Sequence, residues 1–227
     1  MKRFALLLCV MLPGQLAAAA IAGAAEVIHS DSIPLAPTNW SSAITIPKFD
    51  PTLGALNSIV FTLNGHIQGT TKFESLDSQP STVTMLLSAQ LKLLRPDNSL
   101  ITVAIPTITT ADFATAFDGL IDYKGTSGMT HGDLSANQIV TSTSPPPISD
   151  LALFTGPGNI TLPVIAIGYS MGSGPGNLYL IYSSSASAEV GVKYIYDLIP
   201  EPPTFLAILS GLGGVTCAFA RKRKRAA

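Results

Sequence analysis

The sequence predicts an all-β fold: an antiparallel β-sandwich flanked by an N-terminal signal helix and a C-terminal transmembrane helix. Three observations predict it. Apolar and polar residues alternate with a period of two in several runs between residues 26 and 199, which places the apolar side chains on one face of a strand. Clusters of Gly, Pro, Asn and Asp separate these runs, as turns do. Both ends of the chain combine apolar segments with basic residues.

The N-terminal segment, residues 1–25, has the three parts of a secretory signal peptide. Basic residues open it, an apolar run follows, and small residues close it. Pro13-Gly14 interrupts any continuous helix through the segment. We therefore expect signal peptidase to cut between Ala25 and Glu26, with an uncleaved membrane anchor as the alternative.

The middle of the chain, residues 26–199, predicts one β domain. Alternation is clearest over 59–67, 83–93 and 192–198, and this pattern favours an antiparallel sandwich over a βαβ fold. Further strands are expected in apolar runs at 100–108, 151–154, 160–167 and 178–182.

Local signals interrupt this pattern in three places. Asn64-Gly65 is a strong turn signal, and residues 111–117 can form one short helix. The Ser/Thr/Pro-rich run 141–147 is expected to be a loop that crosses between the sheets. A linker between two half-sized domains is the alternative there.

Charge and cysteine content exclude several classes of function. Residues 26–200 carry six basic against thirteen acidic side chains, a net charge of −7. A body so poor in cations argues against nucleic acid as a partner, because phosphate binding needs clustered Lys and Arg. Cys9 and Cys217 both lie in the apolar ends, so the middle has neither a disulfide framework nor a thiolate metal site.

The C-terminal segment, residues 200–225, combines a short motif with an apolar stretch and a basic end. Pro200, Glu201 and Pro202 precede 17 uncharged residues, 204–220. A helix of that length spans about 25 Å, which is marginal for a hydrocarbon core of about 30 Å. The basic residues that follow should stay in the cytoplasm: Arg221, Lys222, Arg223, Lys224 and Arg225. An ordinary stop-transfer anchor has the same layout and is the alternative.

The order of Pro-Glu-Pro, a Gly-containing apolar helix and a terminal basic cluster resembles the PEP-CTERM sorting signal. The resemblance implies an exported protein of a Gram-negative bacterium, whose precursor is held transiently in the inner membrane. It also implies that an exosortase recognises the tail, often in species that make exopolysaccharide. Two departures from the pattern are Pro203, where the family often has a small residue, and the two alanines after the basic run.

A second resemblance covers most of residues 44–199. The segments 49–63, 154–164, 174–177 and 194–196 are similar to the turn-and-strand signatures of choice-of-anchor E domains. Such a domain is an extracellular module joined to various C-terminal anchors. The resemblance implies no enzymatic activity and supplies no ligand.

One motif points to catalysis. Residues Gly168–Gly172 match G-x-S-x-G, in which Ser170 would be the nucleophile of an α/β-hydrolase. That mechanism needs a helix after the serine and a later histidine, but 173–177 is rich in Gly and Pro, and no histidine follows His131. We therefore predict that the chain is not an enzyme and has no catalytic residues.

Metal ligation is also not predicted. The histidines, His29, His66 and His131, lack the spacing of metal ligands. Calcium binding by four loop carboxylates is a weaker hypothesis, because their spacing does not match a known calcium-binding loop. These residues are Asp112, Asp118, Asp122 and Asp133. The sequence therefore predicts no cofactor and no metal.

Five tyrosines in the last third suggest carbohydrate binding as an alternative function: Tyr169, Tyr179, Tyr182, Tyr194 and Tyr196. Alternation with Val192 predicts that the last two lie in the core. The sequence therefore favours a surface or extracellular-matrix protein that is structural or adhesive. A polysaccharide-binding module would need an exposed aromatic strip on one sheet face, and a secreted hydrolase would need a Ser-His-Asp geometry.

Overall fold

The computed structural model describes residues 24–142 and 148–199. Residues Ala24–Leu198 form a compact unit. Within these ranges, no helix is both long and apolar enough to cross a membrane. The predicted signal helix up to residue 23 and the predicted membrane helix 204–220 lie outside the described residues.

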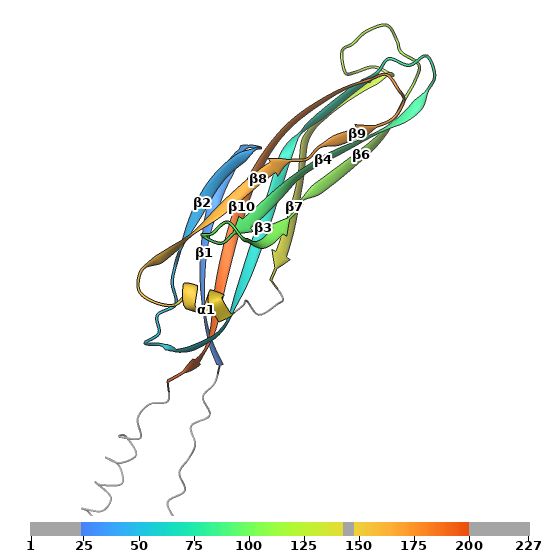
Figure 1. Ribbon diagram of the computed structural model, residues 1–227. Coiled ribbons are helices and arrows are strands. Elements are labelled where there is room, and N and C mark those ends of the chain that lie inside the picture. Colours follow the sequence, from blue (N-terminus) through green and yellow to red (C-terminus); the bar gives the residue numbers. More distant parts are fainter. Residues whose placement is uncertain (1–23, 143–147, 200–227) are drawn as a thin grey trace, which may run out of the picture. The chain divides into compact units, whose positions relative to one another are not determined.

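The compact unit is built from two antiparallel sheets, which confirms the predicted β-sandwich (Figure 1). The four-stranded sheet has the order β1 (Ala24–Pro37), β10 (Leu178–Leu198), β3 (Gly54–Ser75) and β7 (Gly128–Thr141). The six-stranded sheet runs β2 (Trp40–Pro47), β8 (Asn159–Gly168), β4 (Ser81–Leu94) and β5 (Leu100–Ala104). Two further strands pair with β4: β6 (Thr107–Ala114) and β9 (Met171–Ser173). A short helix, α1 (Ile148–Leu153), precedes β8.

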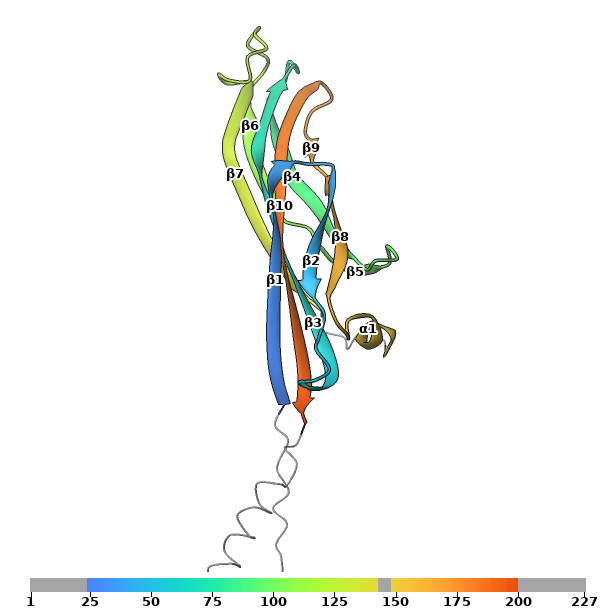
Figure 2. The same ribbon diagram turned by 90° about the vertical axis from the view of Figure 1, so that its left-hand side faces the viewer.

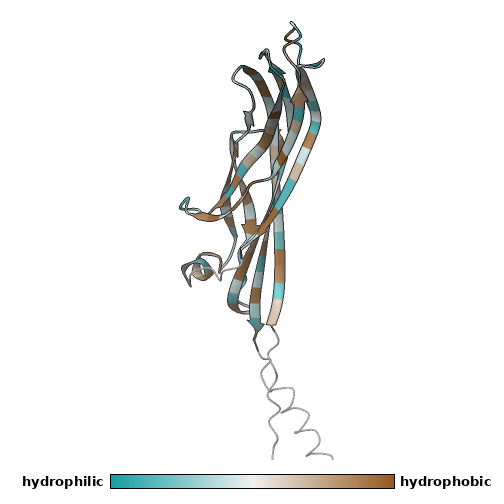
Figure 3. Ribbon diagram, turned by 90° about the vertical axis from the view of Figure 1, so that its right-hand side faces the viewer, coloured by the Kyte–Doolittle hydropathy of each residue, from teal (hydrophilic) through white to brown (hydrophobic). Residues whose placement is uncertain are grey.

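The core lies between the two sheets and follows the predicted alternation. Apolar and polar residues alternate along the strands in Figure 3, and every second residue of β4 from Val83 to Leu93 is buried. The four-stranded sheet contributes β3 side chains such as Phe61 and β10 side chains such as Val192 and Tyr194, all at most 1% exposed. Side chains from two inner faces therefore interdigitate, as in aligned β-sandwiches.

Three local predictions were wrong. Residues 151–154, expected as a strand, lie mostly in α1 (Ile148–Leu153), where Phe154 N donates to the Asp150 carbonyl at 3.0 Å, as in a helical turn. Asn64-Gly65 is not a turn, because β3 continues through it and pairs there with β10 and β7. A Cβ on Gly65 would lie 3.1 Å from the side chains of Leu91 and Ala104, so the glycine makes room for the opposite sheet. Residues 111–117 do not form a helix, because β6 extends to Ala114 and pairs with β4.

The four-stranded sheet has two distinct ends. At one end, called here the terminal end, Ala24 opens β1 opposite Asp197 near the close of β10. At the other, called the distal end, Ser75 lies opposite Leu178. The 21 residues of β10 cover roughly 65 Å at about 3.3 Å per residue. Both ends of the compact unit therefore leave from the same end of the sheet (Figures 1 and 2).

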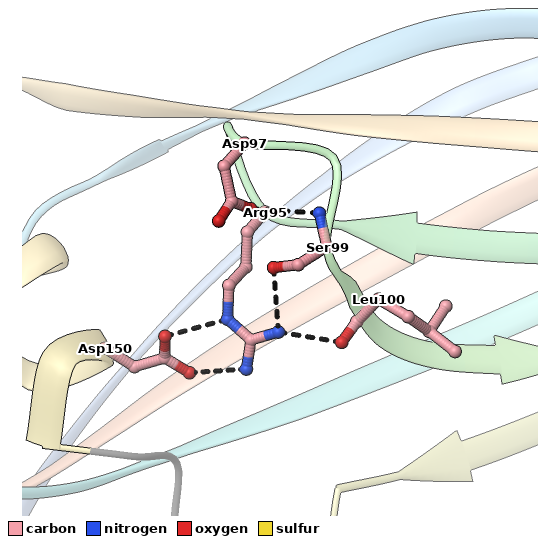
Figure 4. A network of polar contacts seen from close by, with 5 residues as sticks. All are labelled: Arg95, Asp97, Ser99, Leu100 and Asp150. Carbon is pink, nitrogen blue, oxygen red and sulfur yellow. Dashed lines mark hydrogen bonds and ion pairs between the residues drawn. The ribbon is translucent and has the colours of Figure 1, made fainter.

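One ion pair fastens α1 to the turn between β4 and β5 (Figure 4). Arg95 Nε donates to Asp150 Oδ1 at 2.8 Å, and a terminal guanidinium nitrogen donates to Oδ2 at 2.7 Å. The other terminal nitrogen donates to the Leu100 carbonyl at 2.7 Å. Hydrogen bonds from Arg95 to the Asp150 carboxylate raise the pKa of the guanidinium above its usual value.

Candidate functional site

An apolar strip follows β4 on the outer face of the six-stranded sheet. Strand pairing sets Met171 opposite Leu86, Ile167 opposite Gln90 and Phe113 opposite Thr82. These positions alternate with the buried core residues of β4, so they face outward. The exposed side chains of the strip are Phe113 (69%), Tyr169 (58%), Met171 (47%), Ile105 (42%) and Ile167 (41%).

A pocket of about 390 Å³ lies in this strip and is lined by Gln90, Ile105, Ile167 and Tyr169. We call it the Tyr169 pocket. Paired strands β4 and β8 supply Gln90 and Ile167, while Ile105 lies between β5 and β6 and Tyr169 between β8 and β9.

The backbone under the tyrosine is fixed while its ring stays exposed. Tyr169 N donates to the Ser88 carbonyl at 2.8 Å, and Gly168 N donates to Asn39 Oδ1 at 3.1 Å. These bonds hold the corner after β8 against its neighbours. Because its backbone is already ordered, the ring can contact a ligand without a further loss of backbone conformational entropy.

The lining of the Tyr169 pocket favours a neutral, amphipathic ligand. Its walls are two isoleucines and an aromatic ring, and none of the four lining residues is charged. Binding sites combine such apolar walls with a few polar groups that orient the ligand. Here that group is the Gln90 side-chain amide, which both donates and accepts hydrogen bonds. A sugar ring, with an apolar face and hydroxyl edges, fits this chemistry.

The five tyrosines considered for carbohydrate binding divide between the core and the surface. Tyr194 and Tyr196 are buried at 0% and 8% exposure, as the alternation predicted, and Tyr194 Oη donates to the Pro47 carbonyl at 2.9 Å. Tyr182 is partly buried, and burial raises the pKa of its hydroxyl. Only Tyr169 and Tyr179 are exposed, and Tyr179 stands on β10 in the other sheet.

The G-x-S-x-G motif does not have the structure of a nucleophile elbow. That elbow places its serine on a sharp turn between a strand and a helix. Here Ser170 joins β8 to β9, and the residues after it continue as a strand. Ser170 Oγ accepts a hydrogen bond from Ser88 N at 3.4 Å. The motif thus forms a corner between two strands that both pair with β4.

Each histidine contacts another side chain of the domain. His131 Nε2 lies 2.7 Å from Asp112 Oδ2 and joins β7 to β6. His66 Nδ1 lies 2.7 Å from Asn137 Oδ1 on the outer face of the four-stranded sheet. His29 packs edge-on against Tyr194.

The four carboxylates considered for calcium do not converge. Asp118 Oδ1 accepts from Leu120 N and Asp122 Oδ1 accepts from Lys124 N, both at 3.0 Å, so each closes a turn within its own loop. Asp112 pairs with His131 instead. Within 24–142 and 148–199, no group of three or more His, Cys, Asp or Glu side chains is placed to hold a metal ion.

A buried carboxylate that the sequence did not single out holds the long distal loop 115–127. Glu74 is fully buried. Its Oε1 accepts from Ser127 Oγ and its Oε2 from Tyr123 N, both at 2.7 Å. No local pattern marks this residue, because its donors lie about fifty positions away in the chain.

The predicted processing sites lie at or beyond the terminal end. Ala25 lies in β1 opposite Tyr196, and the neighbouring Glu26 Oε2 lies 3.3 Å from Lys193 Nζ of β10. The predicted sorting motif, Pro200, Glu201 and Pro202, begins two residues after β10 ends. That motif and the basic residues 221–225 lie outside the described residues.

Comparisons with known proteins find no related sequence and only distantly similar solved structures. No family model matches the chain, and no curated protein matches it. Among solved structures, similarity is found to the VP2 subviral particle of infectious bursal disease virus, with 12% identity and a TM-score of 0.23. The virus of the Gx strain is also similar, with 13% identity and a TM-score of 0.19. Both matches cover 77% of this chain, which spans only 37% of those chains. Such distant similarities carry no functional argument.

Proposed function

We propose that this chain is an exported surface or extracellular-matrix protein of a Gram-negative bacterium, structural or adhesive rather than enzymatic. In this proposal an exosortase sorts it through its PEP-CTERM tail. The single observation that carries the proposal is the order of features at the C-terminus. Pro200-Glu201-Pro202 is followed by the uncharged segment 204–220 and then by the basic run 221–225.

The geometry of the domain is compatible with attachment at its C-terminus. The last residue of β10, Leu198, is separated from the proposed sorting motif by one residue, Ile199. The predicted signal-cleavage site lies beside it, in the first residues of β1. An attachment at this terminal end would hold the distal loops roughly 65 Å away, given the length of β10.

Mass analysis of the mature C-terminus tests the proposal. The full chain is expressed in a Gram-negative host that makes an exosortase and in a matched strain that lacks it. We expect the basic tail to be lost only in the first strain, with the product in the surface or extracellular fraction. Glu201→Ala should retain the tail, whereas Pro203→Ala, one position outside the motif, should be processed normally. A wild-type product that keeps Arg221 in both strains would refute exosortase sorting.

The Tyr169 pocket favours a second candidate function, binding of a neutral polysaccharide. An exposed ring beside an amide can stack on a sugar and bond its hydroxyls. A polysaccharide-binding module needs exposed aromatic rings on one sheet face, and the outer apolar strip has two, Phe113 and Tyr169.

Affinity electrophoresis of the full chain in gels containing neutral or acidic polysaccharide tests this second function. Tyr169→Ala should weaken retardation by the neutral polymer by about tenfold in affinity, which corresponds to the ~1.4 kcal/mol of one aromatic contact. Tyr179→Ala is the matched control, since its ring is 51% exposed but outside the pocket. Equal retardation of all three proteins would exclude the pocket as the binding site.

A further inference from the structure

Strand β7 is an open edge of the four-stranded sheet. It is the last strand in that sheet and pairs only with β3 along the described chain. Figure 2 shows it as the outermost strand on one side. After its first residue, Gly128, no residue of β7 is buried, which is how a strand without an outer neighbour is expected to look.

The direction of the free backbone groups follows from the register with β3. Ser142 N donates to the Phe61 carbonyl at 2.8 Å, which marks this position as a hydrogen-bonded pair. Hydrogen-bonded and non-hydrogen-bonded pairs alternate along an antiparallel ladder. The register is continuous from Thr62–Thr141 to Gly69–Leu134. The residues whose N–H and C=O groups point away from β3 are therefore Ser135, Asn137, Ile139 and Thr141.

The opposite edge of the same sheet is protected against strand addition. β1 carries Pro34 and Pro37 and a register shift between Ile33 and Ala36. Its Asp31 carboxylate accepts hydrogen bonds from Ser32 N and Thr45 N. Proline, bulges and charged side chains are the features by which natural sheets protect their edges.

The open part of β7 has none of these features. Between Leu134 and Thr141 it contains no charged residue and no proline, and its register with β3 is unbroken. Nearer the distal end the strand shifts register, Asp133 adopts a φ of 55°, and His131 pairs with Asp112 of β6. The unprotected edge is thus confined to Leu134–Thr141.

We propose that two copies of this chain pair through the edge Leu134–Thr141 of β7. The strands run antiparallel about a two-fold axis and join two four-stranded sheets into one continuous sheet. A second copy is the occupant because one edge supplies both sides of a two-fold interface. Head-to-tail addition would require the protected β1 edge. The uncharged edge also offers nothing to select a charged partner.

One register uses every outward-pointing group. With Gln138 on the two-fold axis, Ser135 of one copy faces Thr141 of the other, and Asn137 faces Ile139. The four outward residues of each strand then form about eight backbone hydrogen bonds between the copies. Ile139, whose side chain is 65% exposed, then contacts Asn137 of the second copy as a cross-strand neighbour. This inference does not depend on the proposed function.

Sedimentation of the full chain in mild detergent tests the pairing, with a matched pair of variants. Ile139→Glu places a charge on the open edge of β7. Ile28→Glu places the same charge on the β1 edge, at a residue that is 60% exposed. We expect wild type and Ile28→Glu to sediment as dimers and the protein mass of Ile139→Glu to halve. A monomeric wild type, or a dimer that survives Ile139→Glu, overturns the proposal.

Disulfide trapping gives a second readout that adds no charge to the edge, although Gln138→Cys also removes the side-chain oxygen that accepts a hydrogen bond from Ile105 N. In a chain with Cys9→Ser and Cys217→Ser, Gln138→Cys places two thiols across the axis. Non-hydrogen-bonded pairs have Cα atoms about 4.5 Å apart, within the range of a disulfide. Oxidation should link most Gln138→Cys chains into dimers and leave Ile28→Cys chains monomeric. Equal linking of both variants, or of neither, refutes this register and the two-fold pairing.

Discussion

Removing the Arg95 guanidinium is expected to destabilise the domain more than removing the Asp150 carboxylate. The two groups form two short charge-assisted bonds, 2.8 and 2.7 Å long, of the strong bidentate kind. Their burial differs, because the Asp150 side chain is 3% exposed and the Arg95 side chain 19%. Removing the guanidinium therefore leaves a buried carboxylate without a partner, whereas removing the carboxylate leaves a partly exposed guanidinium (Figure 4).

The magnitudes follow from that asymmetry. Arg95→Met leaves a carboxylate without its cation in the interior, which costs about 3–5 kcal/mol of the free energy of unfolding. Asp150→Asn keeps the shape of the side chain and leaves a cation that reaches water, at a cost of about 1–3 kcal/mol. The double variant contains neither charge, so it should be more stable than the sum of the single effects predicts, by on the order of 2 kcal/mol.

Urea unfolding followed by tryptophan fluorescence measures these costs. Trp40 is the only tryptophan of the chain, and its indole N–H donates to the Ala186 carbonyl of the opposite sheet at 3.1 Å. Its emission should therefore report loss of the sandwich, and the midpoint and slope give the free energy of unfolding. Strict additivity of the two substitutions, or a larger loss from Asp150→Asn, would refute the reasoning.

Three further predictions concern the core, the sheet and the distal loop. Burial raises the pKa of Tyr194 in the folded protein. The protonated hydroxyl should therefore stabilise the fold fully below about pH 10, and this stabilisation should be lost as the pH rises towards the folded-state pKa. Tyr194→Phe should flatten the alkaline limb of a stability–pH profile. A Cβ on Gly69 would overlap a backbone carbonyl of β10, so Gly69→Ala should lower the thermal midpoint strongly. Gly132→Ala, with open space around it, should not. Ser127→Ala removes a donor to the buried Glu74, should cost about 1–3 kcal/mol, and should speed proteolysis within residues 115–127; unchanged cleavage would contradict this role.

The alternation of residues predicted most of the sandwich because a half-buried antiparallel strand has apolar residues on its buried face and polar residues on its exposed face. These residues alternate in the local sequence. The runs 59–67, 83–93 and 192–198 all fall within strands that bury every second side chain. Asn64-Gly65 was misread because the same dipeptide can serve a turn or a close approach between sheets. The close approach of Leu91 from the opposite sheet distinguishes the two cases, and this contact cannot be read from the local sequence.

The Tyr169 pocket could not be predicted in the same way. Its lining comes from strands β4 and β8 and from the connections that follow β5 and β8. The register of β4 with β8 brings Gln90 opposite Ile167. No local pattern specifies which distant strands become neighbours. The sequence did mark Tyr169 as one of several candidate rings, but only burial separates it from Tyr194 and Tyr196.

In the proposed role, the pairing of β10 determines how the domain would resist a pulling force. β10 is hydrogen-bonded on both sides, to β1 and to β3, and its ladder with β3 extends from Leu178 to Leu198. An attachment after Leu198 and a load at the distal loops would pull along this strand. The ladder bonds lie across the strand direction, so such a force would load them together in shear rather than open them one by one. The position of β10 inside the sheet, two residues before the proposed sorting motif, would therefore suit a protein held by its C-terminus.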